Sequence, residues 1–269
     1  MNQKMLPVIK WSGSKRSQAG TIASLFPEFE TYFEPFLGGA SVLIQSRPKR
    51  AICGDVCEPL IEFWNMIKDN PMKMIKDYAK SWQVLQDKGY TTYYKIRDRF
   101  NANPNPSDLL FLSRTCVNGL IRFNSDGKFN NSLHHTRKGI NPKTLENIVL
   151  QWSEYIQNYK FITGNYFETT KSATKNDFVY LDPPYFNTVG RYYGKIIFDD
   201  FIDYLEELGS RNIKYAFSYD GFRGEIDYTV DIPKHVYKRR IFLDSGNSSF
   251  KKVIDKQSQS VKESFYMNF

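Results

Sequence analysis

The sequence contains few of the residues that build disulfide frameworks and metal centres. Its 269 residues include three cysteines. An odd number of thiols in a chain of this length argues against a disulfide framework and favours a reducing, cytoplasmic setting. After Cys53 and Cys57 the sequence has no second Cys/His pair at zinc-finger spacing, so no metal is expected.

Long apolar runs and an acidic surplus are also missing. No stretch approaches the roughly 18 apolar residues of a membrane span, so neither a membrane partner nor an export signal is expected. Lys and Arg total 37 against 29 Asp and Glu, giving a formal net charge of +8, which favours a polyanionic partner. The 21 Phe, 18 Tyr and 4 Trp provide stacking surfaces, and this shifts the expectation towards nucleic acid.

The first part of the chain has the pattern of a doubly wound fold. Thr31–Phe36 predicts a strand, Leu37–Ala40 a tight loop of small residues, and the residues from Ser41 a helix. Small residues let a cofactor approach the backbone closely, although the spacing is not that of a dinucleotide site. Ala51–Asp55 predicts a second strand, and its terminal acid stands where such folds bind a ribose. A plain helix cap is the alternative interpretation of this acid.

Four residues at the end of a later strand suggest a site for a flat, amine-bearing group. Two successive prolines after Phe178–Leu181 and Asp182 lack backbone N–H groups, so the strand must end there. Asp182 and the Pro183 carbonyl can accept hydrogen bonds from an amine, and Tyr185 offers a face on which a base can stack. An ordinary strand-ending turn is the alternative.

The middle of the chain is predicted to be an inserted helical subdomain. Helical periodicity covers Leu60–Phe100, and a further helix is predicted to run to Thr115 with Ser107-Asp108 as its cap. An amphipathic helix ending near Ile156 then returns towards the sheet. The predicted parts are a catalytic domain in two pieces, residues 1–56 and 146–269, and a subdomain over residues 57–145.

A turn in this region carries a hairpin signal. The Asp-Gly pair in Asn124–Gly127 lies between Asn118–Phe123 and Lys128–Asn130. A β-ribbon can enter the major groove of DNA, where Arg122 could pair with guanine. A purely structural hairpin is the alternative.

The remainder of the chain alternates strand and helix, with the pattern of an α/β sheet. The predicted strands are Lys160–Thr163, Phe178–Leu181, Lys214–Ser218, Val236–Leu243 and Glu263–Phe269. The segment Asp244–Lys252 is predicted to be an exposed, polar and basic loop.

Four segments in this order resemble the motifs of the Dam-like (D12 class, alpha group) DNA adenine-N6 methyltransferases. They are Lys10–Lys15, Phe33–Gly39, Asn118–Asn124 and Asp182–Tyr185. The resemblance implies a seven-stranded Rossmann-like methyltransferase sheet, with an inserted helical target-recognition subdomain that carries a β-hairpin. It also implies S-adenosyl-L-methionine as methyl donor and double-stranded DNA as substrate.

The resemblance further implies roles for individual residues. Those expected to receive the flipped adenine are Asp182, Pro183 and Tyr185. Those expected to bind the cofactor are Trp11, Lys15, Glu34, Pro35, Phe36, Gly38, Gly39, Asp55 and Asp182. Those expected to contact DNA are Lys10, Asn118, Arg122, Asn124, Arg137, Lys138, Lys251 and Lys252.

Sequence alone leaves several alternatives open. Methylation of cytosine N4 or of a protein glutamine uses similar chemistry, but Asp182 and the hairpin argue against both. A catalytically silent DNA-binding module is a further alternative. The expected setting is the cytoplasm of a prokaryote, with nucleoid DNA as partner, for a gene of cellular or phage origin. A cognate restriction endonuclease acting on the same site is a possible partner, and the recognition sequence is open, GATC being one candidate.

Overall fold

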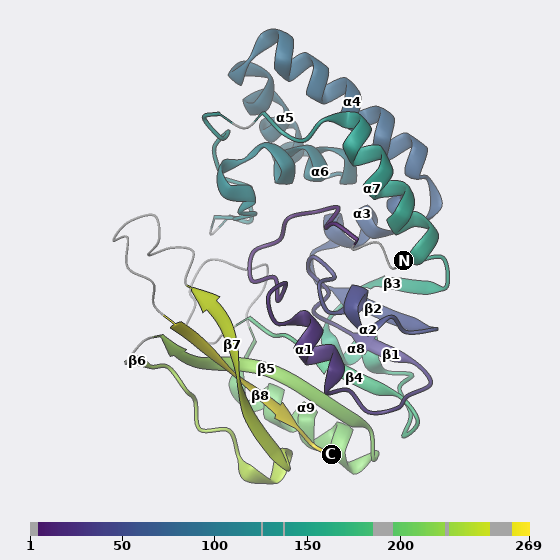
Figure 1. The fold of residues 1–269 in the computed structure, drawn as a ribbon, viewed down its shortest axis with the longest axis vertical. Coiled ribbons are helices and arrows are strands. Elements are labelled where there is room, and N and C mark those ends of the chain that lie inside the picture. The colour runs from purple at the N-terminus through teal and green to yellow at the C-terminus, as the bar shows by residue number, and fades with distance from the viewer. Residues whose placement is uncertain (1–4, 125, 137, 185–195, 224–225, 248–259) are drawn as a thin grey trace.

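The apolar strands of the chain form one mixed sheet with the order β3-β2-β1-β4-β5-β8-β7, and a short strand β6 pairs with β5 (Figure 1). The computed structural model describes residues 5–124, 126–136, 138–184, 196–223, 226–247 and 260–269. Neighbouring strands from β3 to β5 are parallel, whereas β8 runs antiparallel to both β5 and β7. The predicted Rossmann-like α/β sheet is thereby confirmed.

The strands are β1 Tyr32–Glu34, β2 Ala51–Asp55, β3 Tyr159–Thr163, β4 Phe178–Leu181, β5 Lys214–Arg223, β6 Ile226–Asp227, β7 Arg239–Asn247 and β8 Ser260–Met267. The α-helices are α1 Ala19–Ser24, α2 Leu43–Ser46, α3 Glu58–Asp69, α4 Pro71–Lys88, α5 Tyr90–Ala102, α6 Pro106–Thr115, α7 Pro142–Tyr155, α8 Tyr166–Thr170 and α9 Phe198–Ser210.

Two hydrophobic clusters cover opposite faces of the sheet, because successive strand residues point to opposite sides. Tyr32 and Tyr180 belong to the larger cluster, which includes residues of α1, α2 and the helices α3–α7. Their neighbours Phe33 and Leu181 belong to the smaller cluster with α8 and α9. The face towards α1 is the one that matters below, since it carries the polar side chains of the candidate site.

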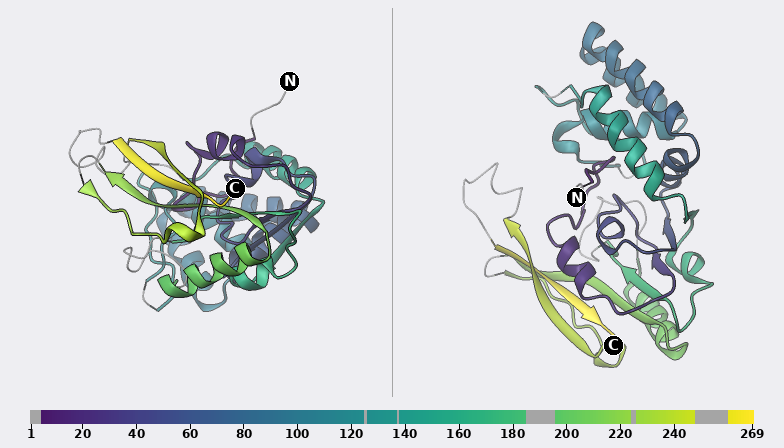
Figure 2. Two further views of the ribbon diagram at one scale, coloured as in Figure 1. Left: turned by 90° about the horizontal axis from the view of Figure 1, so that it is seen from below. Right: turned by 45° about the vertical axis from the view of Figure 1, so that its right-hand side comes forward.

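Helices α4–α7 gather at the end of the molecule opposite strands β5, β7 and β8, as Figures 1 and 2 agree. Asn70 caps α4 by accepting from the Lys73 N–H, and Pro71 occupies its first turn. The predicted cap of α6 was wrong. Asn105 accepts from the Asp108 N–H at 2.9 Å, whereas Ser107 and Asp108 lie inside the helix.

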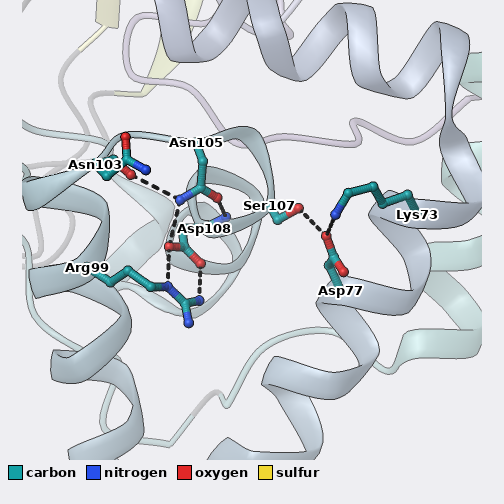
Figure 3. Close-up of polar contacts among 7 residues, drawn as sticks. All are labelled: Lys73, Asp77, Arg99, Asn103, Asn105, Ser107 and Asp108. Carbon is teal, nitrogen blue, oxygen red and sulfur yellow. Dashed lines mark hydrogen bonds and ion pairs between the residues drawn. The ribbon is translucent and has the colours of Figure 1, made fainter.

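Asp108 is instead the buried centre of a polar network between α5 and α6 (Figure 3). Its carboxylate accepts from Arg99 Nε at 2.8 Å, from the terminal Arg99 nitrogen at 2.5 Å, and from Asn105 Nδ2 at 2.9 Å. Its side chain is 3% exposed. Figure 3 also shows Asp77 of α4, which pairs with Lys73 of the same helix and accepts from the Ser107 hydroxyl of α6 at 2.7 Å.

Replacing Asp108 with alanine is expected to lower the free energy of unfolding by about 2 kcal/mol, measured by urea denaturation. The network loses three hydrogen bonds, although the Arg99 side chain, 61% exposed, is rehydrated. The matched control is Asp98→Ala on α5, the helix of Arg99, because Asp98 is 73% exposed and 3.8 Å from Arg97. A change below about 0.5 kcal/mol is expected there. Equal losses in both variants would contradict the importance of the network.

The segment before α1 joins the helical region to the sheet. Arg114 on α6 donates to the carbonyls of Pro7 and Val8, and Trp152 on α7 donates to the Leu6 carbonyl at 2.8 Å. Burial lowers the pKa of Arg114 to about 10. The chain then reaches the candidate site at Lys10–Lys15.

The predicted hairpin has its turn but not a regular ladder. Its two arms meet in isolated antiparallel bridges, Phe123 with Phe129 and Cys116 with Leu133. Asn101 of α5 bonds to both backbone groups of Phe129 through its amide, at 2.8 and 3.0 Å. The side-chain amide of Asn101 therefore satisfies the N–H and the carbonyl of Phe129, as a neighbouring strand would in a regular sheet.

The predicted loop Asp244–Lys252 is corrected at its start, because β7 continues to Asn247. Its pairing partner β8 begins at Ser260, so the antiparallel register carries the ladder past Asp244. Lys251 and Lys252 lie outside the described residues, as do Tyr185 and Arg137. Among the helices of the described ranges, none combines the length and apolar character needed to cross a membrane.

Candidate active site

Four ionisable side chains meet near the carboxyl end of β4, on the sheet face that α1 covers. Asp182 follows Tyr180 by two residues, so the pleat directs it to the same face. Glu34 and Glu263 reach this face from β1 and β8, and Lys15 reaches it from the turn before α1. All four are buried or half-buried.

Lys15 links two of the carboxylates. Its Nζ lies 2.7 Å from Asp182 Oδ1 and 2.8 Å from Glu263 Oε1. The side chains of Lys15, Asp182 and Glu263 are 9%, 19% and 7% exposed. Burial lowers the pKa of Lys15, but the two carboxylates outweigh it and hold the pKa well above the usual value. Lys15 is therefore a permanent cation in this site.

Burial makes the carboxyl group of Asp182 a weaker acid than that of an exposed aspartate. Burial raises its pKa to about 6, Lys15 opposes this rise, and the charge of Glu263 adds to it. An ionised carboxylate with a raised pKa is a stronger hydrogen-bond acceptor than an ordinary surface aspartate. The adjoining Pro183 is buried and Pro184 half-buried, so a rigid backbone follows the carboxylate directly.

Glu34 is a buried carboxyl group at the end of β1, the neighbour of β4. It accepts from the Tyr32 hydroxyl at 3.0 Å. Burial raises its pKa well above the usual value, and the charge of Asp182 adds to the effect. The strand order changes direction between β1 and β4, which is where doubly wound sheets bind ligands at their carboxyl ends.

The loop after β1 is shaped for close approach to its backbone. Gly38 has φ +49°, and a Cβ there would stand 2.8 Å from Cδ1 of Trp11. Ala40, where a third small residue closes the loop, has φ +55°. The indole of Trp11 thus lies on the predicted glycine loop, with Gly39 beneath its Cβ. A side chain at position 38 would collide with this indole, so the close packing requires glycine there.

Asp55 ties this loop to the next strand. Its Oδ2 accepts from the Gly38 N–H at 3.1 Å and its Oδ1 from the Cys57 N–H at 3.0 Å, at the start of α3. Burial raises the pKa of Asp55 to about 6, and these backbone bonds oppose the rise. The carboxylate thus bonds to the N–H of the residue before α3 and orients the glycine loop, without capping the helix.

The other residues predicted for the cofactor divide between the two faces. Pro35 is buried, and Phe36 packs on Tyr166 of α8 with ring centroids 5.6 Å apart, on the face opposite Asp182. Residues two apart in a strand share a face, but β1 ends at Glu34, and the bend at Pro35 directs Phe36 to the opposite face.

Lys10 and the hairpin lie in direct contact. Gly119 has φ +65°, and a Cβ there would stand 2.1 Å from Cδ of Lys10. The hydroxyl of Ser12 donates to the Ile121 carbonyl at 2.9 Å. Residues more than 100 positions apart thus form one surface. It carries two predicted DNA contacts, Lys10 and Arg122.

The remaining described residues of the DNA set are on the surface or shape the turn. Arg122 is exposed, and its Nε donates to Asn130 Oδ1 at 3.1 Å. Asn118 is exposed in a left-handed conformation with φ +57°. Asn124 accepts from two N–H groups of its own turn, which gives it a structural task that the sequence did not reveal. Lys138 is exposed.

Three residues near the site were not found from the sequence. Glu263 bonds to Lys15, and Tyr180 exchanges a hydrogen bond of 2.9 Å with Ser218 on β5. A signal for Glu263 was present, since it occupies an inward position in a strand whose other inward residues include Phe265 and Met267. A lone carboxylate in such an alternation is costly to bury unless it has a partner. The described residues contain no group of three or more His, Cys, Asp or Glu side chains able to hold a metal.

Comparison with known proteins agrees with this geometry. A family model described as D12 class N6 adenine-specific DNA methyltransferase matches residues 11–259. A type II methyltransferase of Methanocaldococcus jannaschii is 27% identical, over 98% of this chain and 99% of the relative. A DNA adenine methylase of Vibrio cholerae is 32% identical, over 68% of this chain and 66% of the relative.

A further match, to a type II methyltransferase of Lactococcus lactis, is 32% identical over 66% of this chain and 65% of the relative. The family model extends from the segment of Trp11 and Lys15 through Asp182 and across β5, β6 and β7, and it ends just before β8. The chain therefore belongs to the D12 class of N6 adenine-specific DNA methyltransferases.

Proposed function

We propose that this DNA adenine methyltransferase uses S-adenosyl-L-methionine as donor and receives a flipped adenine between Asp182, Pro183 and Tyr185. The observation that carries the proposal is the position of Asp182 and the Pro183 carbonyl, at the end of β4 and beside the glycine loop of β1. An adenine N6 amine is inaccessible within the duplex, so the base must leave the stack, at a few kcal/mol.

The residues at the ends of β1 and β2 fit the proposed donor. Gly38 and Gly39 let the side chain of Trp11 pack directly on the loop backbone, so that its indole supplies an aromatic wall at the end of β1. Asp55 stands at the strand end from which such folds hydrogen-bond a ribose. When bound, the donor would supply a methyl group already activated by its sulfonium, so the protein's own groups need only orient and polarise the amine.

Asp182 and the Pro183 carbonyl would each accept one N6 hydrogen. This draws the nitrogen lone pair out of conjugation with the ring and offsets positive charge that develops on N6. Tyr185, whose role is proposed from its motif, would hold the base by stacking. The Asp182 carboxylate must be ionised to act in this way, and its pKa of about 6 places that requirement just below neutral pH.

The experiment is methyl transfer from labelled S-adenosyl-L-methionine to plasmid DNA by purified protein, followed by identification of the modified base. N6-methyladenine is the expected product. If the product is N4-methylcytosine, the protein catalyses the related cytosine reaction instead. If it binds DNA without transferring a methyl group, it is a DNA-binding module. Sequencing the modified sites would give the recognition sequence. Because one relative is a type II methyltransferase, we also propose a cognate restriction endonuclease. The test is whether the product of a neighbouring gene cleaves unmethylated DNA at the same recognition sequence.

Arg122→Ala is expected to cost about 1–3 kcal/mol of discrimination at one base pair of the target. Arg122 is exposed on the hairpin and oriented by Asn130, so its terminal N–H groups can face a guanine edge. The measurement is kcat/KM on the cognate duplex and on duplexes changed at each position. Lys138→Ala is the matched control, for which uniform weakening and a shallower salt dependence are expected. Uniform weakening by Arg122→Ala would contradict base reading.

A further inference from the structure

We propose that Glu263 is a positioning residue for methyl transfer, which holds Lys15 so that Lys15 orients the Asp182 carboxylate without reducing its strength as an acceptor. The inference rests on the proposed role of Asp182 as acceptor for the adenine amine. Glu263 itself comes from β8, two strands away from β4 in the sheet, and no motif of the sequence points to it.

The geometry makes Lys15 a bridge. Its Nζ is within 2.8 Å of one oxygen from each carboxylate, at 2.7 Å from Asp182 Oδ1 and 2.8 Å from Glu263 Oε1. Asp182 Oδ1 is therefore engaged, and Asp182 Oδ2 is the oxygen left to face a substrate amine. A carboxylate held at one oxygen by a buried ammonium has one preferred orientation, which is what a group that must meet an amine requires.

The number of charges is the unusual feature. One carboxylate is enough to neutralise Lys15, yet its Nζ bonds to two, and the charge of Asp182 in turn raises the pKa of a third carboxyl group, Glu34 on β1. The Tyr180 hydroxyl, which exchanges a hydrogen bond with Ser218, also lies beside Lys15. Burying a carboxylate costs free energy that an apolar side chain at the same position would not, so packing alone does not explain Glu263.

The second carboxylate changes what Lys15 does to Asp182. An ammonium committed to Asp182 alone would draw electron density from it and make it a weaker acceptor. When Lys15 also bonds to Glu263, it still orients the Asp182 carboxylate. It then draws less electron density from Asp182, so more negative charge stays on that carboxylate. The charge of Glu263 raises the pKa of Asp182, as expected if more negative charge stays on the Asp182 carboxylate.

Glu263→Gln tests the inference, because glutamine keeps the shape and removes the charge. The expected result is a fall in kcat of about tenfold with KM for DNA and donor unchanged. The acid limb of the kcat profile, set by Asp182, is expected to move roughly one unit to lower pH, because a negative neighbour is lost. A residue that merely supported the fold would lower the melting temperature and leave that limb in place.

Two further variants complete the test. Glu263→Asp keeps the charge but shortens the side chain, so the acid limb should stay at the wild-type pH while kcat falls severalfold. This variant decides the matter should Glu263→Gln fail to fold. Glu154→Gln, an exposed glutamate of α7, is the matched control and should change nothing.

Activity of the wild-type protein in the same assay separates the two levels of inference. A wild-type protein without methyl transfer would overturn the proposed function. An active wild type whose Glu263→Gln variant keeps its kcat, or whose acid limb stays or moves to higher pH, would overturn the role of Glu263 alone. The same holds for a Glu263→Asp variant with wild-type kcat.

Discussion

Asp182→Asn is expected to lower kcat about 10²–10³-fold while leaving the affinity for the methyl donor nearly unchanged. Lys15 lies 2.7 Å from one oxygen of the Asp182 side chain and needs an acceptor there. An asparagine would therefore turn its carbonyl towards Lys15 and its NH2 towards the adenine amine. The substitution thus places a donor where the reaction needs an acceptor, which is a larger change than the loss of one hydrogen bond.

Single-turnover methyl transfer measures this effect free of product release, and calorimetric titration measures donor binding. The matched control is Asp203→Asn on α9, an exposed aspartate on the other face of the sheet, whose kcat should equal that of the wild type. Retention of more than about a tenth of the wild-type rate by Asp182→Asn would contradict the role of the carboxylate.

Residues at strand ends were predictable from the sequence because local chemistry determines them. The paired prolines after Asp182 end β4, and the small residues around Gly38 form the turn after β1, whatever else the chain does. The sheet order follows from parallel pairing of such units. The four motifs in their order then indicated the family, two of them at the ends of β1 and β4 and two in the segments before α1 and after α6.

Contacts between distant segments were not predictable in this way. Glu263 and Lys15 are separated by almost the whole chain, and their meeting depends on the antiparallel placement of β8 beside β5. The contact of Lys10 with Gly119 likewise depends on how the segment before α1 crosses the hairpin. Such pairs arise from topology, on which local sequence patterns carry no information.

Local competition explains the smaller errors. Asn105, Ser107 and Asp108 are all good helix-capping residues, and the structure uses the first because Asp108 is taken by Arg99. The hairpin signal of Asn124–Gly127 was correct for the turn. Its arms pair in isolated bridges, and the amide of Asn101 bonds to the Phe129 N–H and carbonyl on the side away from Phe123.

Lys15→Met is expected to lower the free energy of unfolding by about 3–5 kcal/mol near neutral pH, since it leaves two buried carboxylates without their shared cation. Asp182 and Glu263 then repel each other, and one of them binds a proton far more readily in the folded than in the unfolded state. A carboxyl group with a raised folded-state pKa stabilises the protein at low pH, and this stabilisation is lost as the pH rises through that pKa. The pKa of Asp182, already about 6 beside Lys15, should rise further without it. The loss should therefore be much smaller at pH 5 than at pH 8.

Urea denaturation at the two pH values measures this dependence. Lys143→Met is the matched control, because Lys143 is 81% exposed and pairs with Glu146 on the surface of α7 at 3.4 Å, so a change below about 0.5 kcal/mol is expected at either pH. Adding Glu263→Gln to Lys15→Met removes one of the repelling charges and should restore much of the stability at pH 8, though not the methyl transfer. A loss that is the same at both pH values would mean that Lys15 supports the fold by packing. If stability recovers at low pH and in the double variant, Lys15 stabilises the fold through its positive charge, which neutralises both Asp182 and Glu263.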